Sequence, residues 1–221
     1  MDNYLSKKIK SLPISATLEM AAKTRELKNK GVDIIGLSLG EPDFNTPDFI
    51  KEAAIYAIND NYNSYTPVDG YHDLKQAVCD KFRRDNGLNY EPDQIVISTG
   101  AKQSIANTIQ VLVNEGDDVL LVAPYWVSYS AIVTLAGGNP IEIRSDISTD
   151  FKISPTQLEE KITKKTKLLL IPNLIGMIPE WEKIHKLAKK YKLKIIEDSA
   201  DTIGATIRNK TTGLYSDISI T

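Results

Sequence analysis

Residues 94–143 read QIVISTGAKQSIANTIQVLVNEGDDVLLVAPYWVSYSAIVTLAGGNPIEI. Gln94–Ser98 and Val119–Val122 are short, largely apolar runs, and such runs are typical of strands covered on both faces. Between them, apolar residues recur every three or four positions, which predicts a helix. A second helix is expected over Ser128–Leu135, ending at the following glycine pair, and Ile141–Ile143 predicts another short strand. Strands that alternate with helices in this way indicate parallel β-strands.

The alternation continues toward the C-terminus. Leu168–Ile171 and Lys194–Glu197 predict two further buried strands. Ser154, Pro155 and Gln157 have the pattern of a helix start, with serine as the cap and glutamine three residues later. One more helix face is marked by Trp181, Ile184, Leu187, Ala188 and Tyr191. Together these elements predict an α/β fold, a three-layer sandwich with a mostly parallel sheet.

The first ninety residues have a different pattern. Helices are expected over Leu18–Lys30, Pro47–Asn59 and Tyr71–Asn86. Between them lie two connections rich in proline and glycine, Gly40–Phe44 and Tyr65–Gly70. Such connections are either plain surface loops or places where binding groups gather, and each pattern alone leaves both interpretations open.

Composition narrows the class of protein. The 221 residues include 42% hydrophobic and 25% charged side chains, which is ordinary for a globular protein, and the formal net charge is −2. Charges of both signs are mixed along the chain, so we expect neither nucleic acid nor a membrane surface as a partner. The single Cys79 excludes an internal disulfide. We therefore predict a soluble, cytoplasmic protein.

A candidate phosphate site follows the first predicted strand. Gly100, Ala101 and Lys102 lie where this strand meets a helix. Small residues at such a junction let backbone N–H groups approach an anion, and the helix dipole favours negative charge there. The alternative is a tight turn that needs glycine only for its backbone conformation. Neither the dinucleotide-binding glycine pattern nor the P-loop spacing is present.

Two further candidates follow later strands. Trp126 lies in the aromatic run Pro124–Tyr129 and could stack on a flat ring, or else pack against a neighbouring helix. Asp198 ends a predicted apolar strand, where a carboxylate needs a cation such as a protonated pyridine nitrogen. Capping of the following segment is the competing role for Asp198.

In this order, the candidates and several flanking segments resemble the class I aminotransferases of the aspartate aminotransferase type, in their bacterial subgroup. The resemblance covers residues from about Ser15 to Lys167. It is carried by Ser15–Thr17, Leu39–Phe44, Tyr65–Pro67 with Gly70, Gly100–Gln103 and Pro124–Tyr129. It implies pyridoxal 5'-phosphate as cofactor, an amino acid and a 2-oxo acid as substrates, and a homodimer with shared sites. It also implies an N-terminal arm and part of a small domain over residues 1–45, and a cofactor-binding large domain over residues 46–221.

The same resemblance assigns roles to individual residues. Gly100, Ala101 and Lys102 would hold the cofactor phosphate, and Trp126 would stack on the pyridine ring. Tyr65 would reach the phosphate of the partner subunit. Three positions would contact the substrate: Gly40 at its α-carboxylate, and Thr17 and Lys102 in favouring an acidic side chain.

From about Leu168 the sequence resembles a different branch of the superfamily, the DegT/DnrJ/EryC1 group of sugar aminotransferases and dehydratases. The segments concerned are Ile171–Gly176 and Glu197–Gly204. Asp198 fits the ring-nitrogen position in both branches, and Asn173 would approach the ring hydroxyl. Asp201 stands where aspartate aminotransferases have a tyrosine. The two parts therefore look like pieces of two relatives, and the alternative function is nucleotide-sugar amination or dehydration.

The family's Schiff-base lysine would lie beyond Thr221, after the strand that Asp217–Thr221 begins, and so would the arginine that binds the substrate carboxylate. We therefore interpret the chain as truncated within its large domain. Transamination needs that amine to hold the aldehyde and to act as base, so we predict that the chain alone is inactive. A non-catalytic chimera that keeps the cofactor pocket is the remaining alternative.

Overall fold

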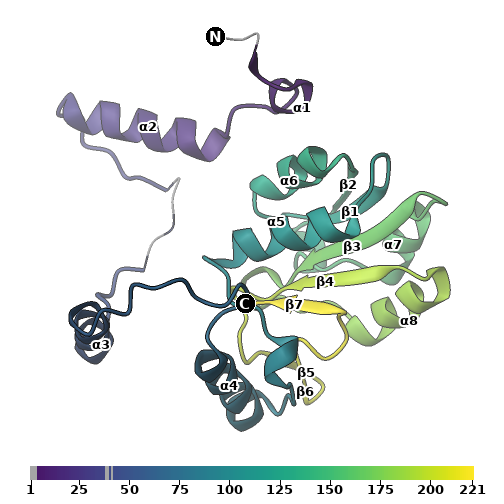
Figure 1. Ribbon diagram of the computed structural model, residues 1–221. Helices are drawn as coiled ribbons and strands as arrows, with labels where there is room; N and C mark the ends of the chain where they lie inside the picture. The colour runs from purple at the N-terminus through teal and green to yellow at the C-terminus, as the bar shows by residue number, and fades with distance from the viewer. Residues whose placement is uncertain (1–3, 38–39, 41) are drawn as a thin grey trace. The chain divides into compact units, whose positions relative to one another are not determined.

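The computed structural model describes residues 4–37, 40 and 42–221, and its chain divides into two compact units (Figure 1). The smaller unit is Ile14–Tyr71, and the larger unit comprises His72–Thr221 with the residues before Ile14. The expected domain boundary between residues 45 and 46 falls inside the smaller unit, and it remains a prediction about functional domains. Within the described residues, no helix is both long and apolar enough to cross a membrane.

A five-stranded sheet lies at the centre of the larger unit, in the order β2-β1-β3-β4-β7, and every neighbouring pair is parallel. The strands are β1 Asp118–Ala123, β2 Asn139–Arg144, β3 Thr166–Pro172, β4 Lys194–Asp198 and β7 Ile218–Ile220. Pro172 at the end of β3 pairs with Asp198 at the end of β4, so both strands stop at the same level. The predicted α/β fold with a mostly parallel sheet is confirmed.

The helices described in the larger unit are α1 Lys7–Lys10, α4 His72–Lys81, α5 Ala101–Leu112, α6 Ser128–Ala136, α7 Pro155–Lys161 and α8 Trp181–Tyr191. Among them, α6, α7 and α8 connect strands of the sheet, and the other helices precede β1 in the chain. A π-helical turn, Phe82–Asn86, continues α4, and short 3-10 turns cover Pro92–Gln94, Ile147–Thr149 and Leu174–Gly176. A small antiparallel pair is formed by β5 Thr206–Ile207 and β6 Lys210–Thr211. The predicted start of α7 is confirmed, because the Ser154 side chain accepts from the Gln157 N–H and Gln157 bonds back to Ser154.

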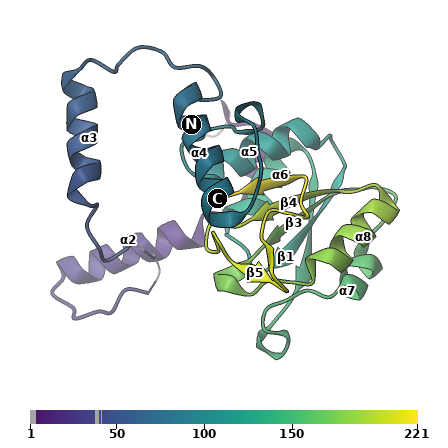
Figure 2. The same cartoon turned by 90° about the horizontal axis from the view of Figure 1, so that it is seen from below.

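Helices cover both faces of the sheet (Figures 1 and 2), and a hydrophobic core lies on each face. Leu120 and Val122 of β1 pack with residues of α7 and α8, whereas Val119 and Leu121 pack with residues of α5 and α6. Successive side chains of a strand point to opposite faces. Because helices cover both faces, successive residues at the centres of β1 and β3 are apolar, which explains the continuous runs in the sequence.

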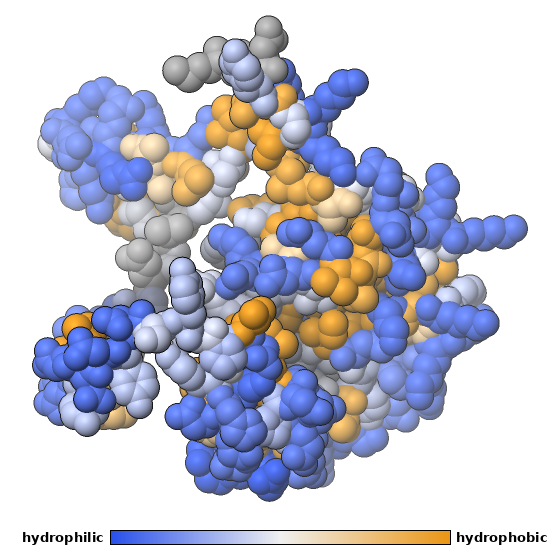
Figure 3. Space-filling model, viewed as in Figure 1, coloured by the Kyte–Doolittle hydropathy of each residue, from blue (hydrophilic) through white to orange (hydrophobic). Residues whose placement is uncertain are grey.

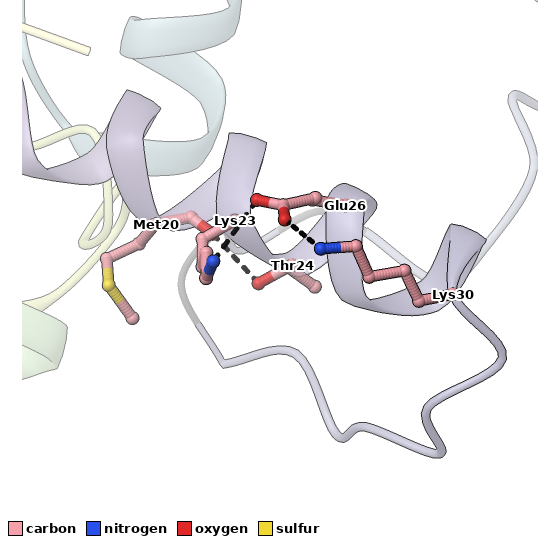
Figure 4. Close-up of polar contacts among 5 residues, drawn as sticks. All are labelled: Met20, Lys23, Thr24, Glu26 and Lys30. Carbon is pink, nitrogen blue, oxygen red and sulfur yellow. Dashed lines mark hydrogen bonds and ion pairs between the residues drawn. The ribbon is translucent and has the colours of Figure 1, made fainter.

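The smaller unit contains α2 Ala16–Asn29 and α3 Asp48–Asn59, and neither helix has a buried residue. Local polar contacts stabilise α2 (Figure 4). The Thr24 hydroxyl donates to the Met20 carbonyl, and Lys30 and Lys23 both bond to Glu26. These two lysines, Lys30 most strongly, lower the pKa of Glu26 below its usual range.

One predicted strand is wrong. Ile95 has an extended backbone, but Ile95–Ser98 does not belong to the sheet, and Gln94 ends a 3-10 turn. A β-strand is defined by hydrogen bonds to a neighbouring strand as well as by its own sequence. No strand among the described residues lies beside this segment, so its apolar, β-branched sequence is not enough.

Candidate active site

A pocket of about 450 Å³ opens at the carboxyl ends of the strands. Its walls come from the first residues of α5 and from the segments that follow β1, β3 and β4. In open parallel sheets, this edge is where ligands bind, because the loops converge there. The pocket contains five of the predicted site residues, Ala101, Lys102, Trp126, Asn173 and Asp198.

The N-terminus of α5 forms the first wall. Gly100 precedes the helix with φ of +84°, and no atom lies within 4 Å of the position that a side-chain Cβ would take. The Thr99 N–H donates to the Gln103 side chain, and the Gln103 N–H donates to the Gly100 carbonyl. The N–H groups of Ala101 and Lys102 lie in the first helical turn, which has no intrahelical acceptor for them. This wall therefore offers backbone donors and the positive end of a helix dipole to an anion.

An indole ring and an ammonium group form the second wall. The Lys102 Nζ lies 5.3 Å from the centre of the Trp126 ring. A cation over an indole face is attracted by the negative charge of the ring face. Trp126 is 48% exposed, so much of its ring surface remains free to contact a flat molecule.

The third wall holds Asp198 in one orientation. Tyr129 is buried and its hydroxyl donates to Asp198 Oδ2, while Oδ1 accepts from the Ala200 N–H at 3.1 Å. The Tyr125 ring stacks nearly parallel to Tyr129, with ring centres 6.2 Å apart. Burial, followed by the bond to Asp198, raises the pKa of Tyr129 far above its usual range. The phenol therefore stays a donor, and it fixes the Asp198 carboxylate as an acceptor at the pocket wall.

Tyr129 was not among the predicted site residues. Its position in the sequence could have suggested it as a site residue, because Tyr129 is the last residue of the aromatic run Pro124–Tyr129 and lies three residues after Trp126. Sequence spacing alone did not reveal that the Tyr129 hydroxyl reaches a carboxylate 69 positions later in the chain.

The Asn173 side chain belongs to a buried hydrogen-bond network at the pocket wall. Its Oδ1 accepts from the Trp181 Nε1–H at 2.9 Å, and its Nδ2 donates to Glu197 and to Ser199, both at 2.9 Å. Glu197 is fully buried and also accepts from the Ser199 hydroxyl and the Gly213 N–H. An amide nitrogen has two hydrogens, so both are already used. The predicted contact between Asn173 and a ring hydroxyl stays a prediction, and these bonds compete with it.

Pyridoxal phosphate, which the sequence resemblance implies, fits the donor set of this pocket. Backbone donors at α5 suit its phosphate, the Trp126 ring suits its flat pyridine, and the Asp198 carboxylate suits a protonated ring nitrogen. The residues that would hold it are Gly100, Ala101, Lys102, Trp126 and Asp198.

The remaining predicted residues, Thr17, Gly40 and Tyr65, belong to the smaller unit. Gly40 and Tyr65 are exposed there, and Thr17 is half-buried. Leu39 and Glu41, which flank Gly40 in the quoted motif, lie outside the described residues. The proposed contacts of this group with substrate and partner subunit stay predictions.

Comparison with known proteins identifies the family. Residues 32–204 match the family described as aminotransferase class I and II. This match continues past Lys167 and includes both Asn173 and Asp198. The chain is 44% identical over 204 residues to an aspartate aminotransferase of Bacillus sp. (strain YM-2), covering 90% of this chain and 52% of the relative. It is 47% identical over 190 residues to a probable aspartate/prephenate aminotransferase of Rickettsia felis, covering 85% and 46%.

Solved structures agree. The aspartate aminotransferase of Thermus thermophilus with maleate superposes with a TM-score of 0.82 at 35% identity, over 88% of this chain and 52% of that one. The alanine aminotransferase of Pyrococcus furiosus gives 0.83 at 27% identity, over 94% and 55%. The chain thus spans about half the length of the relatives it matches. With this fold, this pocket and this match over residues 32–204, the chain belongs to the class I and II aminotransferase family.

Proposed function

We propose that this protein provides the cofactor-binding part of a pyridoxal-phosphate-dependent aminotransferase whose amino donor is acidic, with aspartate as the leading candidate and a 2-oxo acid as acceptor. One observation carries the proposal: the α5 N-terminus, the Trp126 ring and the Asp198 carboxylate line a single pocket. These are the three groups that a phosphorylated pyridine needs. The names of the relatives, aspartate and aspartate/prephenate aminotransferase, support the choice of substrate.

Each residue has a distinct task. Ala101 and Lys102 would bind the phosphate through backbone N–H groups, and Gly100 leaves room for it because it has no side chain. Trp126 would keep the ring in one plane. Asp198, oriented by Tyr129, would keep the ring nitrogen protonated. The cofactor, when bound, supplies the electron sink for reactions at an amino acid's Cα, and the protein supplies position and charge.

Substrate contacts and assembly extend the proposal. Lys102 and Thr17 would favour a dicarboxylic substrate, and Gly40 would offer its backbone to the α-carboxylate. Tyr65 would reach the phosphate of a partner subunit, which implies a homodimer. The proposed setting is the cytoplasm.

Titration of the purified chain with pyridoxal phosphate, followed by absorbance and fluorescence, tests the proposal. We expect saturable binding that falls at least ten-fold in Asp198→Asn, because a hydrogen bond to a charged group contributes about 1.5–3 kcal/mol. Asp150→Asn, which changes an exposed carboxylate on a turn, is the matched control and should bind as the wild type does. Absence of saturable binding, or an equal loss in both variants, contradicts the proposal.

Chemistry on the bound cofactor is tested separately. We expect no aspartate–2-oxoglutarate transfer by the isolated chain, and no lysine adduct after borohydride reduction, because the lysine that forms it is expected beyond Thr221. A stoichiometric adduct with turnover would restore a complete catalytic site. Binding without either is the result that the proposal predicts for the isolated chain.

A second candidate is nucleotide-sugar amination or dehydration. It is favoured by the sequence of Ile171–Thr221 and by Asp201, which lies in the pocket wall where a tyrosine is expected in aspartate aminotransferases. Calorimetry with the cofactor-loaded chain separates the two candidates. Binding of maleate but not of a thymidine-diphosphate sugar supports the acidic substrate, and the opposite result supports the sugar.

A further inference from the structure

The wall of the candidate active-site pocket contains a second carboxylate beside that of Asp198. Asp198 and Asp201 both line the pocket, and Lys102 is the only cationic side chain among the described residues that line it. Hydrophilic residues make up most of the face seen in Figure 3, so exposure alone does not make a carboxylate a site residue. What distinguishes Asp201 is its place in this pocket.

A tight turn after β4 places Asp201 on the pocket wall. Asp198 Oδ1 accepts from the Ala200 N–H at 3.1 Å. The Thr202 N–H donates to the Ser199 carbonyl at 3.0 Å. Ser199 and Thr202 are buried in this turn, whereas Asp201 is exposed and lines the pocket. The backbone turn, rather than any bond of its own side chain, therefore holds Asp201 in the wall.

The two carboxylates differ in what they already bind. Asp198 accepts from the Tyr129 hydroxyl and from a backbone N–H. The Asp201 side chain forms no hydrogen bond or ion pair with any described residue. Its charge nevertheless acts on the site, because burial first, then Asp198 and then Asp201 raise the pKa of Tyr129. Asp201 thus brings to the pocket a negative charge that no described side chain balances.

A ligand of the pyridoxal type uses the other charges of the pocket but not this one. Its phosphate suits the α5 N-terminus and Lys102, and its protonated ring nitrogen suits Asp198. In the aldehyde form, the remaining ring substituents carry no positive charge. A ligand that fills the pocket displaces water from Asp201, and a carboxylate that loses water without gaining a donor costs free energy.

The amine form of the same ligand removes this imbalance. It has the same ring and phosphate, and its aminomethyl group is protonated at neutral pH, as other primary alkyl amines are. An ammonium group offers three N–H donors and one positive charge. A hydrogen bond between an ammonium group and a carboxylate is roughly twice as strong as one between neutral groups.

We propose that Asp201 makes the pocket select the amine form of the cofactor, pyridoxamine 5'-phosphate, over the aldehyde form, by accepting a hydrogen bond from the ammonium group. The inference rests on the proposed function and deepens it, because it names the form of the cofactor that this chain prefers. Asp198 binds what the two forms share, and Asp201 binds what distinguishes them.

Calorimetry with three ligands tests the preference at neutral pH. Pyridoxamine 5'-phosphate carries the ammonium group, pyridoxine 5'-phosphate has a neutral hydroxyl at that position, and pyridoxal 5'-phosphate has the aldehyde. We expect the purified chain to bind the amine roughly five-fold or more tightly than either of the others, which is about 1 kcal/mol, the upper end for an exposed ion pair. Pyridoxine 5'-phosphate is the stricter comparison, because it is close to the amine in size and cannot react with surface lysines.

Three variants assign the preference to one carboxylate. Asp201→Asn keeps the size of the side chain and removes its charge, and the fold should be retained because that side chain bonds to no described residue. We expect the ratio of the dissociation constants of pyridoxine and pyridoxamine phosphates to fall below about two in Asp201→Asn. Asp198→Asn should weaken both ligands and keep the ratio, because both have the ring nitrogen. Asp150→Asn, at an exposed carboxylate outside the pocket, should leave both constants unchanged.

The outcomes separate this inference from the proposed function. Equal affinity of the wild type for pyridoxamine and pyridoxine phosphates overturns the inference alone, and so does a ratio that Asp201→Asn leaves unchanged. Absence of saturable binding by all three ligands overturns the proposed function, and this inference with it.

Discussion

The buried Asn173 network gives a prediction that separates structure from cofactor binding. The change is Asn173→Ala. It removes the acceptor of the Trp181 Nε1–H and one donor to Glu197, in a region where Trp181 and Glu197 are 2% and 0% exposed. None of these groups can turn to water instead.

The magnitude follows from those two losses. A buried donor left without an acceptor costs about 1–3 kcal/mol, and a hydrogen bond to a charged group contributes about 1.5–3 kcal/mol. Because neighbours relax and Glu197 keeps Ser199 and Gly213 as donors, we expect the free energy of unfolding to fall by about 3 kcal/mol. For a chain of this size, that lowers Tm by roughly 6–12 °C.

The assay pairs thermal unfolding, followed by circular dichroism, with pyridoxal phosphate titration. Since both Asn173 amide hydrogens are already used, the affinity of Asn173→Ala for the cofactor should stay close to that of the wild type at a temperature where both are folded. Asn114→Ala, at an exposed asparagine, is the control and should change the free energy of unfolding by no more than about 0.5 kcal/mol. An unchanged Tm with a ten-fold weaker cofactor affinity would refute the reasoning and restore Asn173 as a cofactor ligand.

Three further predictions concern the same unit. The raised pKa of Tyr129 means that the folded chain keeps a proton which the unfolded chain loses above the ordinary tyrosine pKa of about 10, so the contribution of Tyr129 to stability is complete below that pH and declines above it. Between pH 9 and pH 11, the free energy of unfolding in urea should therefore fall less in Tyr129→Phe than in the wild type. An equal fall in both would contradict this reasoning. Gly138→Ala should destabilise the chain by about 1–3 kcal/mol, because the new Cβ would lie 2.6 Å from Val113 Cγ1, and an unchanged urea midpoint would show that the site can relax. Leu158→Ala leaves a cavity between α7 and the sheet and should cost about 2–5 kcal/mol in the same assay, whereas a loss below about 1 kcal/mol would mean that the core collapses into the space.

Much of the fold could be predicted because its strands are buried on both faces. Val119–Val122 and Leu168–Ile171 each lie within an observed strand, since a continuous apolar run suits a strand covered on both faces, and Lys194–Glu197, with two apolar residues at its centre, lies within β4. The α7 start was equally local, because a cap is formed by residues three positions apart. Gln94–Ser98 has the same kind of sequence and failed as a prediction, because pairing depends on a neighbour that its own residues do not specify.

For the candidate site too, some residues could be predicted from the sequence and some contacts could not. The pocket positions of Trp126 and Asp198, after β1 and at the end of β4, follow from one rule, that the carboxyl ends of parallel strands meet at one edge, and the sequence contained enough to apply it. The Tyr129–Asp198 bond and the Asn173–Glu197–Trp181 network depend on side-chain directions across separate strands and helices, which no local pattern encodes.

The residues alone were therefore enough to predict four strands of the sheet, the cap of α7 and the family resemblance, since each depends on residues near one another in the chain or on motifs in a set order. The folded structure was needed to show which groups share the pocket, which hydrogen bonds Asn173 makes, and that Ile95–Ser98 lies outside the sheet. The physical reason is that hydrogen bonds and packing between distant segments depend on distances that appear only once the sheet has formed.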